Sequence, residues 1–359
     1  MPVLPLPPGS TLGILGGGQL GRMLALAAAR LGFDVAILEH EPYSPAARVA
    51  AHAVVGDYDN PRALESLSRL ASVVTYEFEN VPAAAVLKLQ GLGVEVAPGP
   101  EALAVAQDRV AEKQFLNASG APTVAFTAAD TAAEATAAVR AMGGPVLMKT
   151  RREGYDGKGQ RWVAHAEDAA ATFFALGGVP VILEARADFT RELSIIAARG
   201  RDGATAIYPL AENHHEGGIL RRSLAPATVT PELANDAERI AVRVLSGLSY
   251  VGVIGIELFE LRDGRLLVNE IAPRVHNTGH WTQDGCQVDQ FEQHIRAVAG
   301  WPLGSTRAIA QVEMLNLLGE EADAWAKYAA EPQTRLHLYG KRGAKPGRKM
   351  GHINRVKPF

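Results

Sequence analysis

Near its N-terminus the chain reads strand, glycine turn, helix and strand, and this order limits the possible folds more than any other feature. Residues 11–17 form an apolar strand that runs into glycines, and residues 19–31 have apolar positions at helical spacing. Gly32 ends that helix before a second apolar strand at 33–39. A β-turn-α-β unit of this kind opens a parallel sheet. We therefore predict one α/β domain over residues 10 to about 100, with further strands at 52–56, 72–78 and 94–98 and helices that begin at Pro61 and Pro82.

After residue 100 the pattern changes to that of an α+β region. Predicted helices cover 101–117, 127–142, 166–176 and 231–248, and predicted strands cover 145–150, 161–164, 179–185, 191–199, 204–210, 251–261 and 265–274. The turn Arg262-Asp263-Gly264 joins the last two strands into a hairpin. Residues 307–359 are predicted to be a small, mostly β segment.

Composition excludes several classes of protein. A length of 359 residues indicates two or three domains, and a net charge of −3 is unlike that of a protein that wraps nucleic acid. The single cysteine, Cys286, excludes an internal disulfide and a thiolate metal site, and it fits a reducing cytoplasm. The chain has no apolar run of about 18 residues, so we expect no membrane span. We expect residues 1–10, which carry four prolines and no basic region, to be a lead-in and not a signal peptide.

The glycine turn, residues 16–21, matches G-x-G-x-x-G, and Glu39 ends the second strand. Together they are typical of a dinucleotide site, and hence of an NAD(P)-dependent oxidoreductase. The physical content is narrower, because a helix N-terminus with free N–H groups also binds the phosphate of any small metabolite. A tight turn without a ligand is the third interpretation.

Two buried carboxylates carry the strongest chemical signal. Glu257 and Glu270 lie among apolar residues on the two hairpin strands, each five or six residues from the turn, with Asn269 beside Glu270. Carboxylates in such surroundings are costly unless they bind cations. Oxygen ligands at this spacing suit Mg²⁺, which uses one or two carboxylates plus phosphate oxygens. An exposed sheet face is the alternative, and it is what we expect for Glu260 and Asp263.

A phosphate-binding pattern precedes the hairpin. Lys149 ends an apolar strand, and the loop 153–160 follows it with three glycines in six residues. Such a loop forms a flexible flap whose N–H groups can cover phosphates. Glu184 lies where the small module rejoins the rest of the chain and can meet an adenine, and Glu192 can hold ribose hydroxyls.

These features together resemble the ATP-grasp superfamily over nearly the whole chain. Within it, five segments are similar to the N5-carboxyaminoimidazole ribonucleotide synthases: 13–23, 75–82, 149–160, 214–223 and, most specifically, NEIAPRVHNTGHWT at 269–282. The resemblance implies an N-terminal parallel α/β domain before the ATP-grasp (1–104), a two-lobed ATP-grasp domain (105–306, with a lid lobe at about 123–187) and a small β-rich C-terminal domain with a basic tail (307–359). It also implies a cytoplasmic homodimer.

The resemblance further implies ATP- and bicarbonate-dependent carboxylation of 5-aminoimidazole ribonucleotide through carboxyphosphate. Two Mg²⁺ ions, with Mn²⁺ as an alternative, would lie on Glu257 and Glu270. The residues that it places around ATP are Arg109, Lys113, Lys149, Gly154, Tyr155, Asp156, Gly157, Lys158, Gly159, Gln160, Glu184, Ala185, Arg186, Ala187, Glu192, His215, Asn269 and Glu270. Those that it places at the reacting centre are Arg274, His276 and Asn277, with Tyr155, Asp156 and Lys158 closing over it. The expected contacts of the aminoimidazole nucleotide are Gly18, Gln19, Leu20, Glu77, Asn80, Lys341, Arg348 and Lys349.

Three other functions stay open at this point. A formate-dependent glycinamide ribonucleotide transformylase would share the glycine turn, the lid and the metal pair. An NAD(P)-dependent oxidoreductase would rest on the glycine turn alone. A nucleotide-binding protein without catalysis would leave Arg274, His276 and both glutamates without a purpose. The basic residues from Lys341 to Lys357 are either a solvated tail or a phosphate site.

Overall fold

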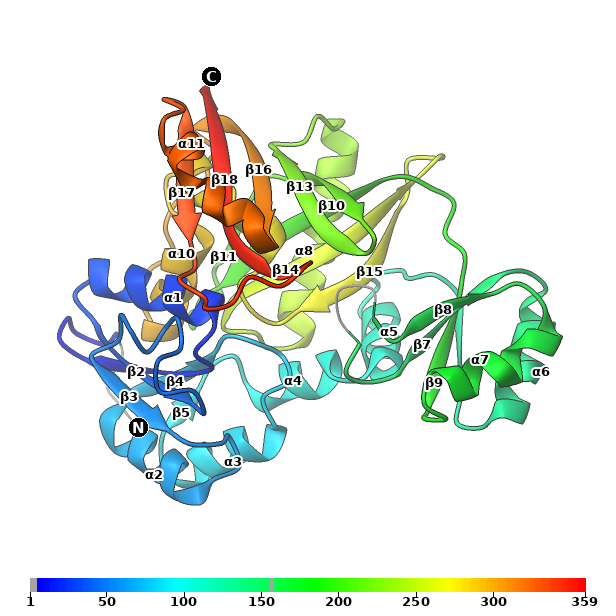
Figure 1. Cartoon of the computed structure of the whole chain (residues 1–359), viewed down its shortest axis with the longest axis horizontal. Helices are drawn as coiled ribbons and strands as arrows, with labels where there is room; N and C mark the ends of the chain where they lie inside the picture. Colours follow the sequence, from blue (N-terminus) through cyan, green and yellow to red (C-terminus); the bar gives the residue numbers. More distant parts are fainter. Residues whose placement is uncertain (1–4, 155–157) are drawn as a thin grey trace.

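The N-terminal part is a five-stranded parallel sheet with helices between the strands, as predicted (Figure 1). The computed structural model describes residues 5–154 and 158–359. The strand order is β3-β2-β1-β4-β5, which places the first strand, with its glycine turn, at the centre. The elements are β1 (Thr11–Leu15), α1 (Gln19–Arg30), β2 (Asp34–Glu39), β3 (His52–Val55), α2 (Pro61–Leu70), β4 (Val73–Tyr76), α3 (Ala83–Gly91) and β5 (Glu95–Val96).

Two short helices follow where the sequence predicts a single helix at 101–117. They are α4 (Pro100–Ala106) and α5 (Arg109–Ala118). The side chain of Asp108 accepts hydrogen bonds from the N–H groups of Val110 and Ala111 and so starts a new helix. This cap makes α5 a helix separate from α4. Helix α5 packs on β15 (Leu266–Ala272), the strand that carries Glu270.

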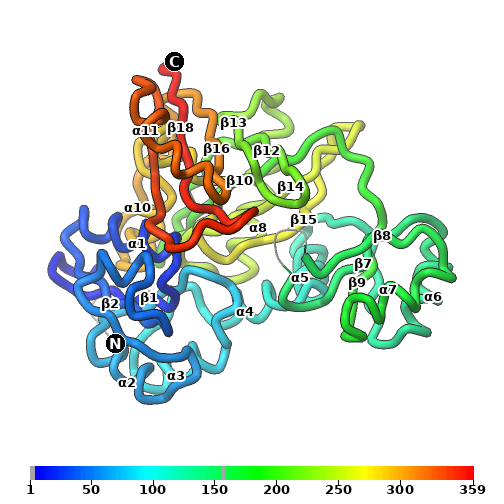
Figure 2. The backbone as a smooth tube through the Cα atoms, in the orientation of Figure 1, coloured from blue at the N-terminus to red at the C-terminus, as the bar shows by residue number. Residues whose placement is uncertain are grey.

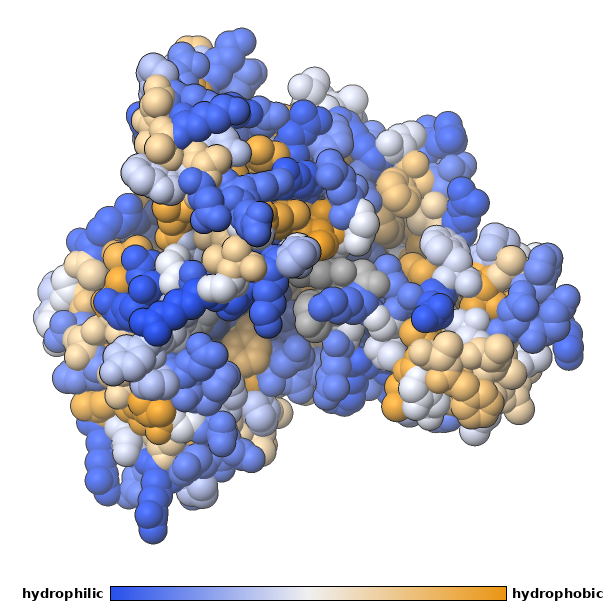
Figure 3. Space-filling model, viewed as in Figure 1, coloured by the Kyte–Doolittle hydropathy of each residue, from blue (hydrophilic) through white to orange (hydrophobic). Residues whose placement is uncertain are grey.

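The lid lobe is a four-stranded antiparallel sheet with helices packed on it, and it stands apart from the rest of the molecule in the tube view (Figure 2). The strand order is β6-β9-β7-β8. Its elements are β6 (Phe126–Ala129), α6 (Ala132–Met142), β7 (Val146–Thr150), β8 (Gln160–Val163), η1 (Ala166–Asp168), α7 (Ala169–Ala175) and β9 (Val181–Ala185). The space-filling view shows a hollow between this lobe and the main body (Figure 3).

The third sheet has nine strands and includes the C-terminal strands. Its path is β15-β14-β10-β12-β13-β16-β18-β17, and β11 pairs with β10. The strands are β10 (Phe189–Arg199), β11 (Thr205–Ile207), β12 (Ala211–Glu216), β13 (Ile219–Ala225), β14 (Gly252–Leu261), β15 (Leu266–Ala272), β16 (Ala310–Leu318), β17 (Thr334–Leu338) and β18 (Lys349–Pro358). The helices beside them are α8 (Pro231–Gly247), η2 (Asn277–Gly279), α9 (Thr282–Gly285), α10 (Gln290–Ala299), η3 (Gly319–Ala324) and α11 (Trp325–Ala329).

The predicted hairpin and helix 231–248 are present, and residues 307–359 are mostly β as predicted. The strand predicted at 204–210 is shorter, because only Thr205–Ile207 pair with β10. The helix predicted at 127–142 begins only at Ala132, because Phe126–Ala129 pair with β9 as strand β6. The sequence analysis also did not predict β12, β13, α9 or α10. The pairing of β13 with β16 joins the C-terminal strands to the sheet that carries the glutamates.

Candidate active site

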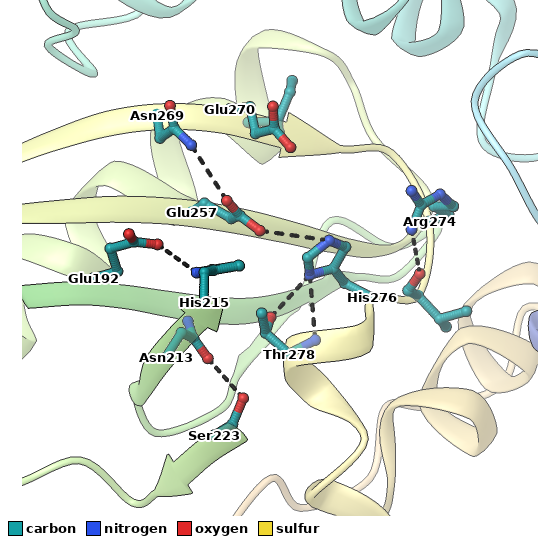
Figure 4. A network of polar contacts seen from close by, with 12 residues as sticks. Glu192, Asn213, His215, Ser223, Glu257, Asn269, Glu270, Arg274, His276 and Thr278 are labelled. Atoms are coloured by element: carbon teal, nitrogen blue, oxygen red, sulfur yellow. Dashed lines mark hydrogen bonds and ion pairs between the residues drawn. The ribbon is translucent and has the colours of Figure 1, made fainter. Parts of the chain in front are cut away.

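The two glutamates of the hairpin face each other across neighbouring strands. Glu257 on β14 pairs in register with Glu270 on β15, next to a bulge between Glu257 and Leu258. Asn269 Nδ2 donates to Glu257 Oε2 at 3.3 Å, and His276 Nε2 lies 3.8 Å from Glu257 Oε1 (Figure 4). Burial and the charge of Glu270 raise the pKa of Glu257 to about 7. The pair therefore holds more negative charge than its surroundings neutralise.

Cations surround the second carboxylate. Arg109 Nη1 lies 3.1 Å from Glu270 Oε2, and Arg109 Nη2 donates to the carbonyl of Gly154, at the start of the flap, at 3.0 Å. Burial alone would raise the pKa of Glu270, but the charges of Arg109 and Lys149 outweigh it and lower that pKa. Arg109 thus connects the flap to the strand that carries Glu270.

Two lysines converge on the hinge carboxylate of the lid lobe. Glu184 lies 2.8 Å from Lys149 Nζ and 3.2 Å from Lys113 Nζ, and all three side chains are buried. Lys113 also donates to the carbonyl of Asn269 at 3.1 Å. Burial opposes ionisation of Glu184, but the two lysines lower its pKa overall. Two buried ammonium groups beside the carboxylate pair form a setting suited to the phosphates of a nucleotide.

The expected ribose-binding residues also lie together. His215 on β12 lies 2.6 Å from the Glu192 carboxylate on β10 (Figure 4). Burial works against protonation of His215, but its contact with Glu192 raises the pKa of the imidazole. Ala185 ends β9, and Arg186 and Ala187 follow it in the hinge.

The flap connects β7 to β8, with Lys149 opposite Gln160. Gly159 accepts a hydrogen bond from the N–H of Thr150, and the Gly154 carbonyl holds Arg109. The side chain of Lys158, in the same loop, also takes part in interactions within the structure. The predictions for Tyr155, Asp156 and Gly157 lie outside the described residues.

Arg274 has a protein partner that sequence reasoning missed. Its guanidinium holds the carboxylate of Glu79 with two hydrogen bonds, one of them 3.0 Å long between Nη2 and Oε1. Although burial opposes ionisation of Glu79, Arg274 lowers its pKa to about 2. Glu79 lies in the segment 75–82 on which the family resemblance rests, and this is the signal that could have identified it.

His276 is a neutral imidazole in this structure. Burial and the charge of Arg274 lower its pKa to about 3. Nδ1 accepts from the N–H of Thr278 at 3.4 Å and lies 2.9 Å from the Thr278 hydroxyl, so the proton is on Nε2, which faces Glu257. Next to it, Asn277 has buried Nδ2 and Oδ1 atoms with no hydrogen-bond partner in the described part of the chain. His276 thus presents an N–H to Glu257, and the next residue, Asn277, has a buried amide with hydrogen-bonding capacity to spare in the described part of the chain.

The glycine turn is filled by carboxylates of the protein itself. The N–H of Gly17 donates to Glu39 Oε2 at 2.7 Å, and the N–H of Gly21 donates to Glu77 Oε2 at 2.6 Å. Glu77 also accepts from the N–H of Gly18, where a Cβ would come 2.6 Å from its Oε1. The G-x-G-x-x-G pattern therefore has a structural reason. The N–H groups on which the dinucleotide interpretation depends already donate to the carboxylates of Glu39 and Glu77.

The remaining residues expected at the aminoimidazole nucleotide are divided between this turn, the His276 segment and the tail loop. Gln19 and Leu20 begin α1, with the Leu20 side chain in the core, and Asn80 is exposed. The charge of Lys341 acts on Glu77, and that of Lys349 acts on His276. Arg348 donates to the carbonyls of Arg342 and Gly343 and so shapes its own loop. The structure thus brings tail cations to both sides of the site.

The donor set fits Mg²⁺ held jointly by protein and phosphates. In residues 5–154 and 158–359, no group of three His, Cys, Asp or Glu side chains is arranged to hold a metal ion by itself. Two acidic side chains with phosphate oxygens completing the shell is the usual arrangement for Mg²⁺. No helix in the described part of the chain is long and apolar enough to cross a membrane.

Three family models match the chain in succession. A ribonucleotide synthetase preATP-grasp domain matches residues 10–107, an ATP-grasp domain matches 114–291, and a phosphoribosylaminoimidazole carboxylase C-terminal domain matches 313–358. The N5-carboxyaminoimidazole ribonucleotide synthase of Brucella melitensis is 50% identical over 98% of this chain and 98% of its own length. That of Pseudomonas aeruginosa is 46% identical over 95% of this chain and 93% of its own length.

The chain belongs to the N5-carboxyaminoimidazole ribonucleotide synthase family.

Solved structures of this family share the whole fold. An ADP complex of an N5-carboxyaminoimidazole ribonucleotide synthetase has a TM-score of 0.94 and 38% identity, and it covers 98% of this chain and 93% of its own. The Aspergillus clavatus synthase, in complex with ADP and 5-aminoimidazole ribonucleotide, has a TM-score of 0.91 and 32% identity over 98% and 94%. The family and the fold class predicted from the sequence are confirmed.

Proposed function

We propose that this enzyme is the ligase that carboxylates 5-aminoimidazole ribonucleotide to N5-carboxyaminoimidazole ribonucleotide, using ATP, in purine biosynthesis. The observation that carries the proposal is the registered pair Glu257 and Glu270, with Lys113, Lys149 and Arg109 beside it. Relatives with this name match the chain over almost its whole length, and a member of the family binds both ADP and the aminoimidazole nucleotide. The relatives named above carry the name of the carboxyaminoimidazole enzyme, which favours this reaction over that of a formate-dependent glycinamide ribonucleotide ligase.

We propose that Glu257 and Glu270 hold Mg²⁺, as two ions with Mn²⁺ as an alternative. Bound there, the metal would neutralise charge on the phosphates. The raised pKa of Glu257 supports this, because a buried carboxylate beside another one lacks a positive partner. Lys113 and Lys149 would turn from Glu184 toward the nucleotide phosphates, and Glu192 with His215 would receive the ribose.

Bicarbonate would be activated as carboxyphosphate at Arg274, His276 and Asn277. Arg274 is held by Glu79, so one side of its guanidinium is fixed and its charge stays next to the carboxylate pair. His276 offers an N–H at Nε2, and the amide of Asn277 has no partner in the described chain. These groups would orient the acid and stabilise its charge, and the flap with Lys158 would exclude water from the unstable intermediate.

The aminoimidazole nucleotide would bind between the glycine turn and the tail. Because Glu39 and Glu77 occupy the N–H groups of the turn, its phosphate would rely on Lys341, Arg348 and Lys349. Glu77, Gln19 and Asn80 would then contact the ribose side of the molecule.

We also propose that the enzyme is a cytoplasmic homodimer with the domain boundaries predicted above. The single buried Cys286 supports a reducing compartment. Light scattering coupled to size-exclusion chromatography tests the oligomer, and a mass of one chain (38.1 kDa) would contradict it.

The deciding experiment measures phosphate release from Mg·ATP with bicarbonate, with and without 5-aminoimidazole ribonucleotide. We expect strong stimulation by that nucleotide. Glycinamide ribonucleotide with formate is the control, and stimulation by that pair alone would transfer the function to the rival ligase. Absence of ATP turnover under all conditions would reject the proposed function.

A further inference from the structure

The amide of Gln290 holds the main chain of His276 on both sides. Its Oε1 accepts from the N–H of His276 at 2.8 Å, and its Nε2 donates to the carbonyl of His276 at 2.7 Å. The same Nε2 lies 3.1 Å from His280 Nδ1, so both amide hydrogens have acceptors. Reversing the amide would place its NH₂ group against the N–H of His276, so these contacts require one orientation.

Gln290 is itself fixed from several directions. It is fully buried and begins α10, which the side chain of Asp289 caps. Its own N–H donates to the hydroxyl of Thr282 at 3.1 Å. A buried amide held by three hydrogen bonds has a single defined position. It can therefore act as a rigid reference for the segment that carries His276.

The position of the His276 ring depends on this segment. His276 lies outside the strands, just after β15, and its N–H bonds to the Gln290 side chain. The ring then extends toward Glu257, with 3.8 Å between Nε2 and Oε1 (Figure 4). A shift of the backbone would move the imidazole relative to the carboxylate pair.

We propose that Gln290 is a positioning residue: its bidentate hold on the His276 peptide sets the imidazole against Glu257 for the reaction. Gln290 acts through His276 and does not contact the substrate. The role rests on the proposed function, because it matters for turnover only if His276 takes part in the carboxylation.

The same helix offers a matched control. Gln293 is one turn further along α10 and is also fully buried. Its Oε1 accepts from the N–H of Gly304 at 2.8 Å, and its Nε2 donates to the carbonyl of Gly304 at 2.7 Å. The two glutamines thus make the same pair of bonds, but only Gln290 makes them to a residue beside the carboxylates.

The experiment compares Gln290→Glu with Gln293→Glu in the full chain. Each change keeps an acceptor and removes the donor, so we expect similar losses of melting temperature. At saturating substrates, we expect kcat of Gln290→Glu to fall by about 10- to 100-fold, the range for a misplaced reacting group, with little change in KM. Gln293→Glu is expected to keep kcat within about twofold. Equal kcat values in the two variants would overturn the proposal.

A second readout does not depend on the reaction. In ¹⁵N-histidine-labelled protein, the imidazole resonances of His276 should shift in Gln290→Glu and stay in place in Gln293→Glu. Unchanged resonances in both variants would overturn the positioning role. If the wild type lacked nucleotide-stimulated turnover, the proposed function would fail, while a shift in Gln290→Glu alone would still support positioning. If Gln290→Glu does not fold, Gln290→Met and Gln293→Met replace the pair under the same criteria.

Discussion

Single carboxylates in this site differ in charge because their neighbours differ. The side chain of Glu257 is 16% exposed and that of Glu270 is 40% exposed. The pKa of Glu257 is raised to about 7, while Arg109 and Lys149 lower that of Glu270. Glu79 is held ionised by Arg274 in the same way. An acid that is fixed in its charged form is the better permanent ligand for a cation.

Replacing Glu270 by Gln tests this assignment. The substitution keeps the shape of the side chain and removes the charge that faces Glu257 and Arg109. We expect nucleotide-stimulated ATP turnover to fall by about two orders of magnitude or more, the scale on which loss of one charge-stabilising group lowers kcat. Phosphate release at saturating Mg²⁺ measures it. Glu260→Gln, on the same hairpin, loses only a peripheral ion pair with Arg191 and should stay within about twofold. Wild-type turnover in Glu270→Gln would contradict the metal site.

The tail cations give a second prediction at the scale of residues. We expect Lys341→Ala and Arg348→Ala each to raise KM for the aminoimidazole nucleotide by at least about tenfold, equal to about 1.4 kcal/mol. KM for ATP should change little. Steady-state kinetics with each substrate varied in turn measures both. Lys327→Ala, exposed on α11, is the control for loss of a basic residue. If neither tail variant changes the apparent affinity, the tail is not the phosphate site.

The sequence could predict that the two glutamates are neighbours but not every partner in the site. Counting from Arg262-Asp263-Gly264 is enough to make Glu257 and Glu270 near neighbours across the hairpin. Their direct pairing depends on the bulge between Glu257 and Leu258, which counting does not predict. The partner of Arg274 is 195 positions away, at Glu79, and no local pattern encodes such a contact. The same holds for Gln290 and His276, which come from elements that no motif connects.

At the scale of elements, β14 packs so closely against the segment that carries His276 that little space is left between them. A Cβ on Gly255 of β14 would come 2.6 Å from the Cβ of His276 and 2.9 Å from its Cγ. Gly255→Ala should therefore displace His276, lower kcat by about tenfold or more, and cost about 1–3 kcal/mol of stability through overpacking. Kinetics and thermal unfolding of the same preparation measure the two effects. Gly144→Ala, where a Cβ would have open space, is the control. Normal kcat in Gly255→Ala would show that His276 tolerates displacement.

Element prediction from sequence succeeded where periodicity was long and failed where capping or tertiary pairing decided. Helix 231–248 was predicted almost to the residue, since its apolar face repeats over 17 positions. The break at Asp108 depends on a cap whose carboxylate also binds Arg151, 43 positions away. Strand β12 carries few apolar residues, and the apolar residues of β13 are interrupted by Arg221, Arg222 and Ser223. Both strands were missed because their partners in the sheet, not their own pattern, hold them.

For the whole molecule, the feature that sequence could not supply is the continuity of the largest sheet. Residues 307–359 were predicted to be mostly β, which is correct, but the prediction did not include the pairing of β16 with β13. Arg222 lies opposite Leu315 in that pairing, and contacts this far apart in sequence depend on the assembled fold. The pairing makes the C-terminal strands part of the same sheet as the glutamate hairpin.

Buried neutral histidines give the molecule a characteristic response to acid. Burial lowers the pKa of His276, His280, His294 and His352, to about 3 in His276 and His294. In the unfolded chain these groups titrate near pH 6.5. Below that pH the unfolded state binds protons that the native state does not, so stability falls as pH falls.

This trend is opposed by carboxylates whose pKa is raised in the native state, namely Glu77, Glu112 and Glu257. The native pKa values of Glu112 and Glu257, about 8 and about 7, lie above the unfolded values, so these groups add stability as pH falls toward about 4.5. Between about pH 5 and 6, the four histidines outweigh Glu112 and Glu257. The stability that these six groups contribute together should therefore decrease as the pH falls through this range.

His294 isolates one proton of this effect, away from the metal site. Its Nδ1 accepts from the N–H of Val253 and its Nε2 lies 2.8 Å from the Thr75 hydroxyl, contacts that Gln can reproduce without a titrating group. In His294→Gln, the slope of unfolding free energy against pH between about 5 and 6.5 should therefore decrease by up to about 1.4 kcal/mol per pH unit. Urea unfolding at several pH values measures the slope. His165→Gln, at an exposed position, is the control and should keep the wild-type slope. An unchanged slope in His294→Gln would mean that His294 takes up its proton in the folded protein as readily as in the unfolded chain, and burial would then not keep it neutral.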